Sequence, residues 1–440
     1  MMKIEIKLLL LISALTLFFV NTNAQQKLSL TIEQAVETGL QNSKTLHSSL
    51  MKVKSAEARL KEINSGRLPS LKLTAAYRRL SSIEPFAISF MGATYTISPS
   101  ILDNYTTQLT LSQPLFTGFK LMSSSDMAEQ SAKATTEDYN KDQSDLVFNV
   151  KNAYWSLFKA TQMKKVMDET VDQATAHIND AKNLLNAGML TENDILKLEV
   201  QLSDVEYRQV DAENAVKLAN VALDNVLNVS LDTEIEIASS PNAATAEYDG
   251  ISNLVNDAVK KRPEVKSADY RVKASEASVT MAQSSWYPQV SLVGDYYYSN
   301  PNSRIFPAVN EFKGTWDAGV NVSLNIWDWL TTAHQTEQAQ AQLTQSMDAL
   351  SITKDNITLE VTQNYLNVNQ AKKRIDISEL GVKQAEENLR ETENRFKNGM
   401  ALSSDVVDAE TAYTTAKTNY TNSVVDYELA KARLDKSIGK

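Results

Sequence analysis

The sequence predicts a mixed α/β membrane protein in which very long helices are joined to short transmembrane strands. Three observations lead to this fold class. Residues from about 31 to 228 recur from about 251 to 439, apolar residues keep heptad spacing over much of each copy, and four short segments alternate strictly between apolar and polar residues. We expect a first repeat over 25–240 and a second over 241–440. With only 12 Gly and 9 Pro in 440 residues, the composition favours long uninterrupted elements.

Residues 1–24 are expected to be a secretory signal peptide and not part of the fold. Lys3 and Lys7 precede an apolar run over residues 8–20, and small residues end the segment before Gln25. A membrane anchor is the alternative, but the run is shorter than a hydrocarbon core requires. There is no cysteine, so neither a disulfide framework nor a lipid-modified N-terminal cysteine is available.

Charge and motif content argue against nucleic-acid binding and against catalysis. The signal peptide takes away two lysines and one glutamate, so the formal charge of −10 becomes −11, and nucleic acid is not expected as a partner. His47, His177 and His334 are far apart and are expected on solvated helix faces. No phosphate-binding loop, zinc helix or nucleophile motif is present, so we expect no enzyme, no cofactor and no metal site.

Two constant offsets relate the repeats. In the opening stretch of each copy the offset is 219, which pairs Tyr77 with Tyr296, and from Leu109 onward it is 211, which pairs Gly188 with Gly399. The first copy therefore carries eight extra residues between Tyr77 and Leu109. We expect one variable loop there.

Heptad spacing predicts two helix pairs. Apolar or small residues recur every three or four positions over 146–185 and, in the second copy, over 357–396. A return helix follows each run, over 195–223 and 406–434. A helix from about 119 to 187 would be about 100 Å long at 1.5 Å per residue, which no compact single-core domain needs.

Four segments show the period of two expected for a strand with one apolar face, at about 70–80, 105–114, 289–298 and 316–327. Each has the length of a tilted transmembrane strand. Aromatic residues flank them at the level that amphipathic rings prefer in a membrane, with Phe116, Trp286, Tyr287, Trp327 and Trp329 at one end and Tyr77, Tyr105, Tyr298 and Trp316 at the other. A soluble four-stranded sheet with an aromatic core is the alternative, but the export signal, strand length and flanking rings agree on a membrane.

Four strands in one chain leave two open sheet edges, which lipid tolerates only at a cost of several kcal/mol per unpaired group. Two copies would give eight strands with a filled interior, whereas three copies give twelve strands and a wider lumen. We therefore expect a homotrimer with a 12-stranded transmembrane barrel. Six repeats then form a ring in which the heptad helices close into a tube.

Several short motifs recur in a fixed order along the chain: Leu30-Thr31-Ile32-Glu33-Gln34-Ala35-Val36, Leu68-Pro69-Ser70-Leu71, Gln113-Pro114-Leu115-Phe116, Arg262-Pro263-Glu264, Tyr287-Pro288-Gln289-Val290, Arg395-Phe396-Lys397-Asn398-Gly399-Met400 and Asp405-Val406-Val407-Asp408-Ala409-Glu410. In order and spacing, they resemble the TolC-type outer-membrane efflux family over essentially the whole mature chain. The resemblance implies an outer-membrane barrel continued by a long periplasmic α-helical barrel with an equatorial band. It further implies a passive exit duct in efflux or type I secretion, docked to a periplasmic adaptor (membrane fusion) protein and an inner-membrane pump that selects the cargo.

Gly188 and Gly399 are each expected to end a long helix in a left-handed conformation. The resemblance implies that these turns are also the periplasmic tips that meet the adaptor, with the contact residues Gly188, Met189, Leu190, Gly399, Met400 and Ala401. Met and Leu on a tight exposed turn would offer a partner an apolar knob.

Asp405 and Asp408 lie three residues apart at the start of a helix. One interpretation is that they complement the helix N-terminus, as Asp194 does in the first copy. The other, implied by the resemblance, is an inward gate in which three chains assemble an acidic ring that attracts cations. The gating latch known in the family needs a tyrosine and an arginine, but Phe396 and Ala401 occupy those positions, so closure here is expected to rely on packing.

The alternative function is a periplasmic coiled-coil adaptor or structural protein without a pore. It shares the heptads, but it predicts one helical hairpin and a glycine-rich lipoyl-like sheet. Loops at about 80–104 and 299–315 are expected to face outside the cell. The linker 229–250 is expected in the equatorial band.

Overall fold

A computed structural model describes residues 27–241 and 248–440. The expected signal peptide, 1–24, lies outside the described residues. The chain forms two compact units, each built from separate stretches of sequence. The first contains the described residues up to His47 together with Asp142–Ala258 and Leu359–Lys440, and the second contains Ser48–Lys141 and Val259–Thr358.

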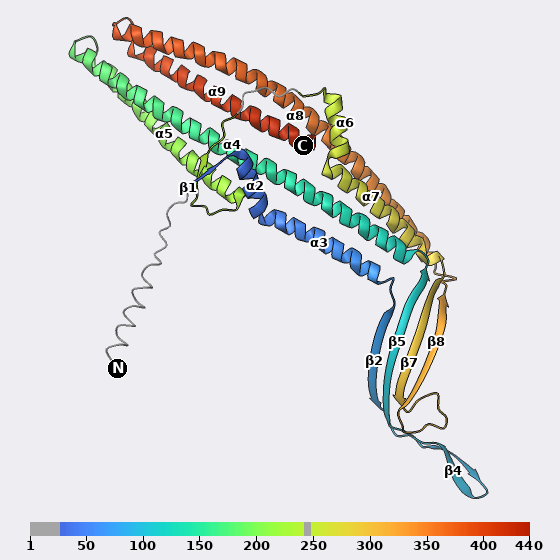
Figure 1. The fold of residues 1–440 in the computed structure, drawn as a ribbon. Helices are drawn as coiled ribbons and strands as arrows, with labels where there is room; N and C mark the ends of the chain where they lie inside the picture. The colour runs from blue at the N-terminus through green and yellow to red at the C-terminus, as the bar shows by residue number, and fades with distance from the viewer. Residues whose placement is uncertain (1–26, 242–247) are drawn as a thin grey trace, which may run out of the picture. The chain divides into compact units, whose positions relative to one another are not determined.

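One order of elements occurs twice along the chain: two short helices, two strands and two long helices (Figure 1). In the first half these are α2 (Ile32–Asn42), α3 (Lys44–Ser65), β2 (Ser70–Arg79), β5 (Asp103–Thr117), α4 (Lys120–Asn186) and α5 (Glu192–Leu227). In the second half they are α6 (Ile251–Lys261), α7 (Pro263–Ala282), β7 (Gln289–Asn300), β8 (Lys313–Ser323), α8 (Thr331–Lys397) and α9 (Ser403–Ser437), with a short 3₁₀ helix, η2 (Gln283–Trp286), before β7.

The long helices have the boundaries that the heptad pattern predicts. Helices α4 and α8 each contain 67 residues, and α4 begins and ends within one residue of the expected 119–187. Every heptad position in 146–185 and 357–396 is buried or half-buried. In the first unit these side chains pack with residues of α5 and α9, in one cluster that also contains Tyr154 and in another that contains Phe396.

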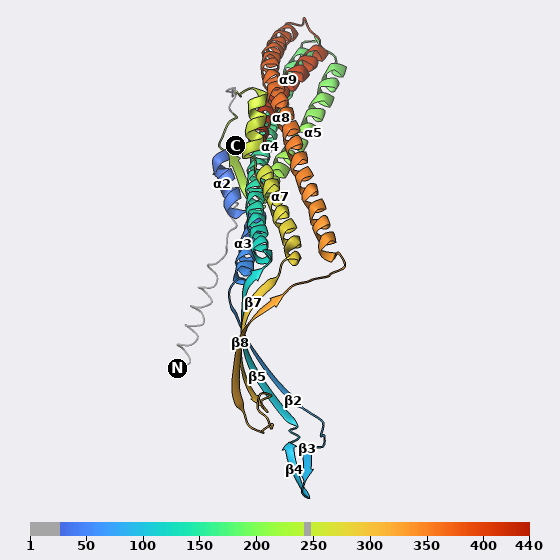
Figure 2. The same ribbon diagram turned by 90° about the vertical axis from the view of Figure 1, so that its right-hand side faces the viewer.

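The second unit contains a four-stranded antiparallel sheet in the order β2-β5-β7-β8, seen from its face in Figure 1 and turned by 90° in Figure 2. The expected strands are present, but β8 ends at Ser323 and does not reach residue 327. The strand stops there because Ser323 faces Gln289, the first residue of β7, so that residues beyond it have no neighbour in this sheet.

A hairpin that the alternation did not predict lies in the expected outer loop. It consists of β3 (Phe86–Phe90) and β4 (Ala93–Ser98), joined by Met91 and Gly92 at φ 48° and 82°. Two positive φ values suit the two-residue turn of a hairpin. Its position explains the extra residues of the first copy.

The linker 229–250 contains a further unexpected strand. β6 (Glu234–Ile237) pairs in parallel with β1 (Lys27–Leu30) within the first unit. Tyr154 fixes this pair, because its hydroxyl donates to the Leu30 carbonyl at 2.9 Å and accepts from the Ser239 amide at 3.0 Å. No helix in the described part of the chain has an apolar stretch suited to crossing a membrane.

Candidate functional site: sheet faces and helix tips

The four-stranded sheet has one apolar and one polar face. The strand register places apolar residues opposite one another on all four strands, as in Leu73 with Leu109, Leu109 with Tyr296 and Tyr296 with Trp316. Most of these side chains are exposed in the single chain. An exposed apolar sheet face of this extent marks a surface that another phase or another molecule covers.

The opposite face carries a hydrogen-bonded polar network. The Asp295 carboxylate accepts from Gln108 at 2.9 Å and from the Thr110 hydroxyl. The Arg304 guanidinium donates to Asp317 at 2.8 Å. Polar side chains ordered on one face of a sheet suit contact with water.

Aromatic side chains cluster at both ends of the sheet. At the end joined to the long helices, the Phe116 and Phe119 rings lie 5.4 Å apart, and so do those of Phe119 and Tyr287. Trp327 and Trp329 lie 5.7 Å apart at this end and are exposed, as is Trp286. At the other end, Phe312 packs on two tyrosines, Tyr105 and Tyr298, near Trp316. Phe119 and Phe312 were not among the predicted girdle residues, because they lie outside the alternating segments.

The two tip turns end α4 and α8 in the same way. Gly188 and Gly399 have φ of 74° and 71°. The amide of Met189 donates to the Leu184 carbonyl at 2.9 Å, and that of Met400 to the Arg395 carbonyl at 2.8 Å. This pattern satisfies the last carbonyls of each helix and leaves Met189 and Met400 exposed by 55% and 70%. Leu190 and Ala401 lie half-buried beneath them.

Of the three acidic residues considered for capping or for a gate, Asp194 and Asp405 serve as helix caps. Asp194 accepts hydrogen bonds from the Thr191 amide at 3.0 Å and hydroxyl at 2.6 Å, and these bonds lower the pKa of Asp194. Asp405 accepts from the Leu402 amide at 2.9 Å. Asp408 is exposed on the same helix as Asp405. A single chain therefore presents the second-copy pair to solvent, with one carboxylate already engaged in capping.

The tips of the two helix pairs pack through Phe396. Its ring is almost fully buried and lies 4.6 Å from the imidazole of His177 on α4, while Lys397 and Asp180 approach to 3.7 Å beside it. Burial lowers the pKa of His177, and the charge of Lys397 acts in the same direction. The prediction that all three histidines are solvated is wrong for His177, because the heptad spacing that predicts α4 does not reveal which neighbouring helix covers its other faces.

A buried acid that was not predicted lies close to the tip. Glu410 on α9 is almost fully buried, and burial, assisted by the charge of Glu393, raises the pKa of Glu410 to about 7. The signal was present in the sequence, since Glu410 follows Ala409 and Val406 on a strongly apolar helix face.

A second buried acid lies by the β1–β6 pair. Asn220 donates to Asp224 at 2.8 Å and to the Thr233 carbonyl at 2.6 Å, and accepts from the Ile235 amide at 2.9 Å. Burial raises the pKa of Asp224 to about 6. The Asn220 side chain thus occupies the free edge of β6 as a further strand would.

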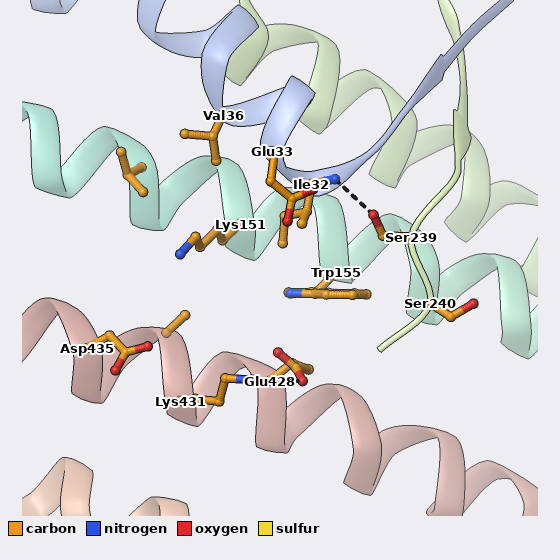
Figure 3. Close-up of a pocket in the computed structure, with 12 residues that line it drawn as sticks. Ile32, Glu33, Val36, Lys151, Trp155, Ser239, Ser240, Glu428, Lys431 and Asp435 are labelled. Carbon is orange, nitrogen blue, oxygen red and sulfur yellow. Dashed lines mark hydrogen bonds and ion pairs between the residues drawn. The ribbon is translucent and has the colours of Figure 1, made fainter. Parts of the chain in front are cut away.

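A cavity of about 610 Å³ lies between α2, α4 and α9 in the first unit (Figure 3). Trp155 and Ile32 supply apolar walls, and the Ile32 amide donates to Ser239 at 3.1 Å. On its wall Lys431 forms an ion pair with Glu428 at 3.4 Å. Among the described residues, no group of three or more side chains is suited to hold a metal ion.

Comparisons with known proteins agree on one family and one fold. The family described as outer membrane efflux protein matches residues 35–229 and 254–440. Outer membrane protein TolC of Vibrio cholerae is 22% identical over 376 residues, covering 85% of this chain and 83% of that protein. The crystal structure of VceC from Vibrio cholerae superposes with a TM-score of 0.78 at 18% identity, covering 93% of this chain and 96% of that one. The corresponding values for CusC are 0.80, 17%, 93% and 92%.

Proposed function

The chain belongs to the outer membrane efflux protein family, and from this premise we propose that three copies form a channel through which substrates leave the cell. As an efflux protein of this family it acts in the outer membrane. In our proposal it is the passive exit duct of a tripartite efflux or type I secretion system, and an inner-membrane pump delivers the cargo.

The sheet is the observation that carries this proposal. Its apolar face is exposed over all four strands, and its edge strands β2 and β8 have no further neighbour in the described chain. Lipid would cover that face, but lipid cannot satisfy open backbone edges. Pairing β8 of one chain with β2 of the next removes every edge, and three chains then supply twelve strands around a lumen lined by the polar face.

The helices support the same assembly. Helix α5 exposes Leu196, Val200 and Tyr207, and α8 exposes Leu359 and Leu366. These apolar residues lie outside the heptad pattern that packs the helices within one chain. We propose that α5 of one chain packs against α8 of the next, which closes a periplasmic α-helical barrel.

We further propose that the tip turns dock to a periplasmic adaptor protein. Met189 and Met400 are adaptable apolar side chains on rigid turns, and this combination suits a protein partner. Asp405 and Asp408 of three chains would form an acidic ring at the same end, and Phe396 would hold the closed state by packing. Phe116, Trp286, Tyr287, Trp316, Trp327 and Trp329 would form the aromatic girdles at the two membrane surfaces.

The alternative, an adaptor without a pore, predicts one helical hairpin. The chain has two, α4–α5 and α8–α9, together with a four-stranded antiparallel sheet. The channel therefore accounts for elements that the adaptor leaves unexplained.

Purification from membranes tests the proposal. We expect the mature protein in the outer-membrane fraction, soluble only with detergent, trimeric by analytical ultracentrifugation and conductive in planar bilayers. A stable water-soluble monomer would contradict the proposal. Release of the protein from membranes by salt alone, without detergent, would favour the adaptor.

A further inference from the structure

The turns that follow β5 and β8 have the same backbone conformation. Gly118 and Phe119 have φ of 60° and 70°, and the residues 211 positions later, Trp329 and Leu330, have φ of 55° and 64°. Helices α4 and α8 begin directly after these pairs.

The residue before each pair caps the helix that follows. The Leu121 amide donates to the Thr117 hydroxyl at 3.3 Å, and the Thr332 amide donates to Asp328 at 3.0 Å. Each acceptor and each donor of the second turn lies 211 positions after its counterpart in the first. The two turns are thus one structural unit, present twice.

In the first copy this turn is covered by the segment that precedes β7. Gly118 lies so close to it that an added Cβ would be 2.3 Å from the Ser284 carbonyl oxygen. The Phe119 ring meets the Tyr287 ring edge to face. The cover therefore comes from the second copy of the repeat.

In the second copy the same turn has no such cover from residues 27–241 and 248–440 of its own chain. Trp329 is 82% exposed and Leu330 is 56% exposed. The offset of 219 assigns Ser65 as the counterpart of Ser284, and Leu68 as that of Tyr287. Leu68 is 63% exposed. The counterparts of the exposed residues Leu330 and Leu68 are therefore Phe119 and Tyr287, whose rings are in contact.

The strand pairs, converted by the same offsets, give a consistent register. Within the chain, Leu111 faces Gly294 and Gln113 faces Leu292. The same offsets convert these pairs into Val322 facing Ala75 and Leu324 facing Leu73. The pair Phe116–Val290 becomes Trp327 facing Leu71. Each converted pair joins apolar or small residues on the apolar sheet face, which is the match that a shared lipid-facing surface requires.

We infer that residues 324–330 of one chain dock on residues 65–73 of a second copy, with β8 prolonged along β2 and Leu330 packed against Leu68. The inference rests on the trimer proposed above and specifies its register. Residues 324–328 become strand only in the assembly, because their neighbour belongs to the next chain. Trp329 cannot repeat the close approach of Gly118, so the docked turn lies farther from α3, and the indole fills the space.

Pairwise cysteine substitution tests the register, since the chain contains no cysteine of its own. In detergent-purified trimers treated with a short thiol-reactive crosslinker, we expect Leu68→Cys/Leu330→Cys and Ala75→Cys/Val322→Cys to give covalently linked chains. The matched control Leu111→Cys/Gly294→Cys should crosslink within a chain and run as a monomer. The shifted control Leu71→Cys/Val322→Cys, four residues out of register, should remain uncrosslinked.

The outcomes test the register separately from the proposed trimeric channel. The register is wrong if trimers crosslink through the shifted pair. It is also wrong if neither predicted pair crosslinks while the internal control reacts. Both outcomes leave the channel proposal intact. A wild-type protein that sediments as a monomer overturns both. Single-cysteine variants establish that each substitution preserves the trimer.

Discussion

The terminal methyl group of Met189 lies over Gly399, since a Cβ added to Gly399 would be 2.8 Å from Met189 Cε. Met189 follows α4 and Gly399 follows α8, so this contact joins the two tip turns of one chain. The two turns therefore form one surface, and the backbone conformation of each turn requires its own glycine, Gly188 or Gly399.

Replacing the glycines of positive φ, Gly188, Gly399 and Gly118, by alanine should show how much unfolding free energy is lost through backbone strain and how much through steric conflict. Gly188→Ala faces open space, so we expect a loss of about 1 kcal/mol in unfolding free energy from the left-handed backbone alone. Gly399→Ala should cost a similar amount and push aside the flexible end of Met189. Gly118→Ala should cost more, because the fixed Ser284 carbonyl blocks it. Chemical denaturation in detergent measures all three, and equal losses would refute this ranking.

Charge on the tip should abolish transport and spare assembly. We expect Met189→Asp/Met400→Asp to lose efflux in cells, since desolvating a carboxylate in an apolar contact is costly. The control Met189→Leu/Met400→Leu keeps the apolar surface and should retain efflux. Normal efflux by the aspartate variant, with trimers present, would show that the turns contact no partner.

Removal of the acidic pair should reduce the preference of the channel for cations. We expect this in planar bilayers for Asp405→Ala/Asp408→Ala, because the lumen would lose six carboxylates. The control Asp194→Ala also removes a capping carboxylate, at about 1 kcal/mol, but should leave ion preference unchanged. Unchanged preference in the double variant would leave capping as the only role of Asp405.

The buried Glu410 should make tip stability depend on pH. Its pKa is about 7 in the folded chain, against 4.5 for the free side chain, so the stabilising effect of the protonated form is complete below pH 4.5 and is lost as pH rises through about 7. Glu410→Gln should match wild type at pH 4.5 and exceed it at pH 8, by a few kcal/mol at most. Hydrogen exchange of α9 at the two pH values measures the difference, and parallel behaviour of both proteins would contradict it.

The sequence predicted the long helices closely, because their heptads extend over many turns and their ends carry glycine and capping residues. Strands β2 and β7 were predicted equally well from alternation. The hairpin β3–β4 and the pair β1–β6 were missed, since strands of four to six residues contain too few periods to be recognised.

The site could be predicted only in part. Turn chemistry is local, so Gly188 and Gly399 were identified from sequence. The burial of His177 and Glu410 depends on which helices meet at the tip, and periodicity within one helix does not contain that information. The end of β8 was predicted too late for a related reason, because residues 324–327 alternate as a strand but have no partner strand in the part of the chain that the structure describes.

The two copies of the repeat differ at several matched positions. Gly118 corresponds to Trp329, Asp408 corresponds to Lys197, and only the first copy carries the β3–β4 hairpin. If each subunit contained only one copy of the repeat, a ring of six identical subunits would have the same residue at all six equivalent positions. In the proposed trimer, two copies in one polypeptide would allow neighbouring positions of the ring to differ, so that side-chain bulk, charge and the outer hairpin would alternate around the axis while the number of helices and strands stays the same.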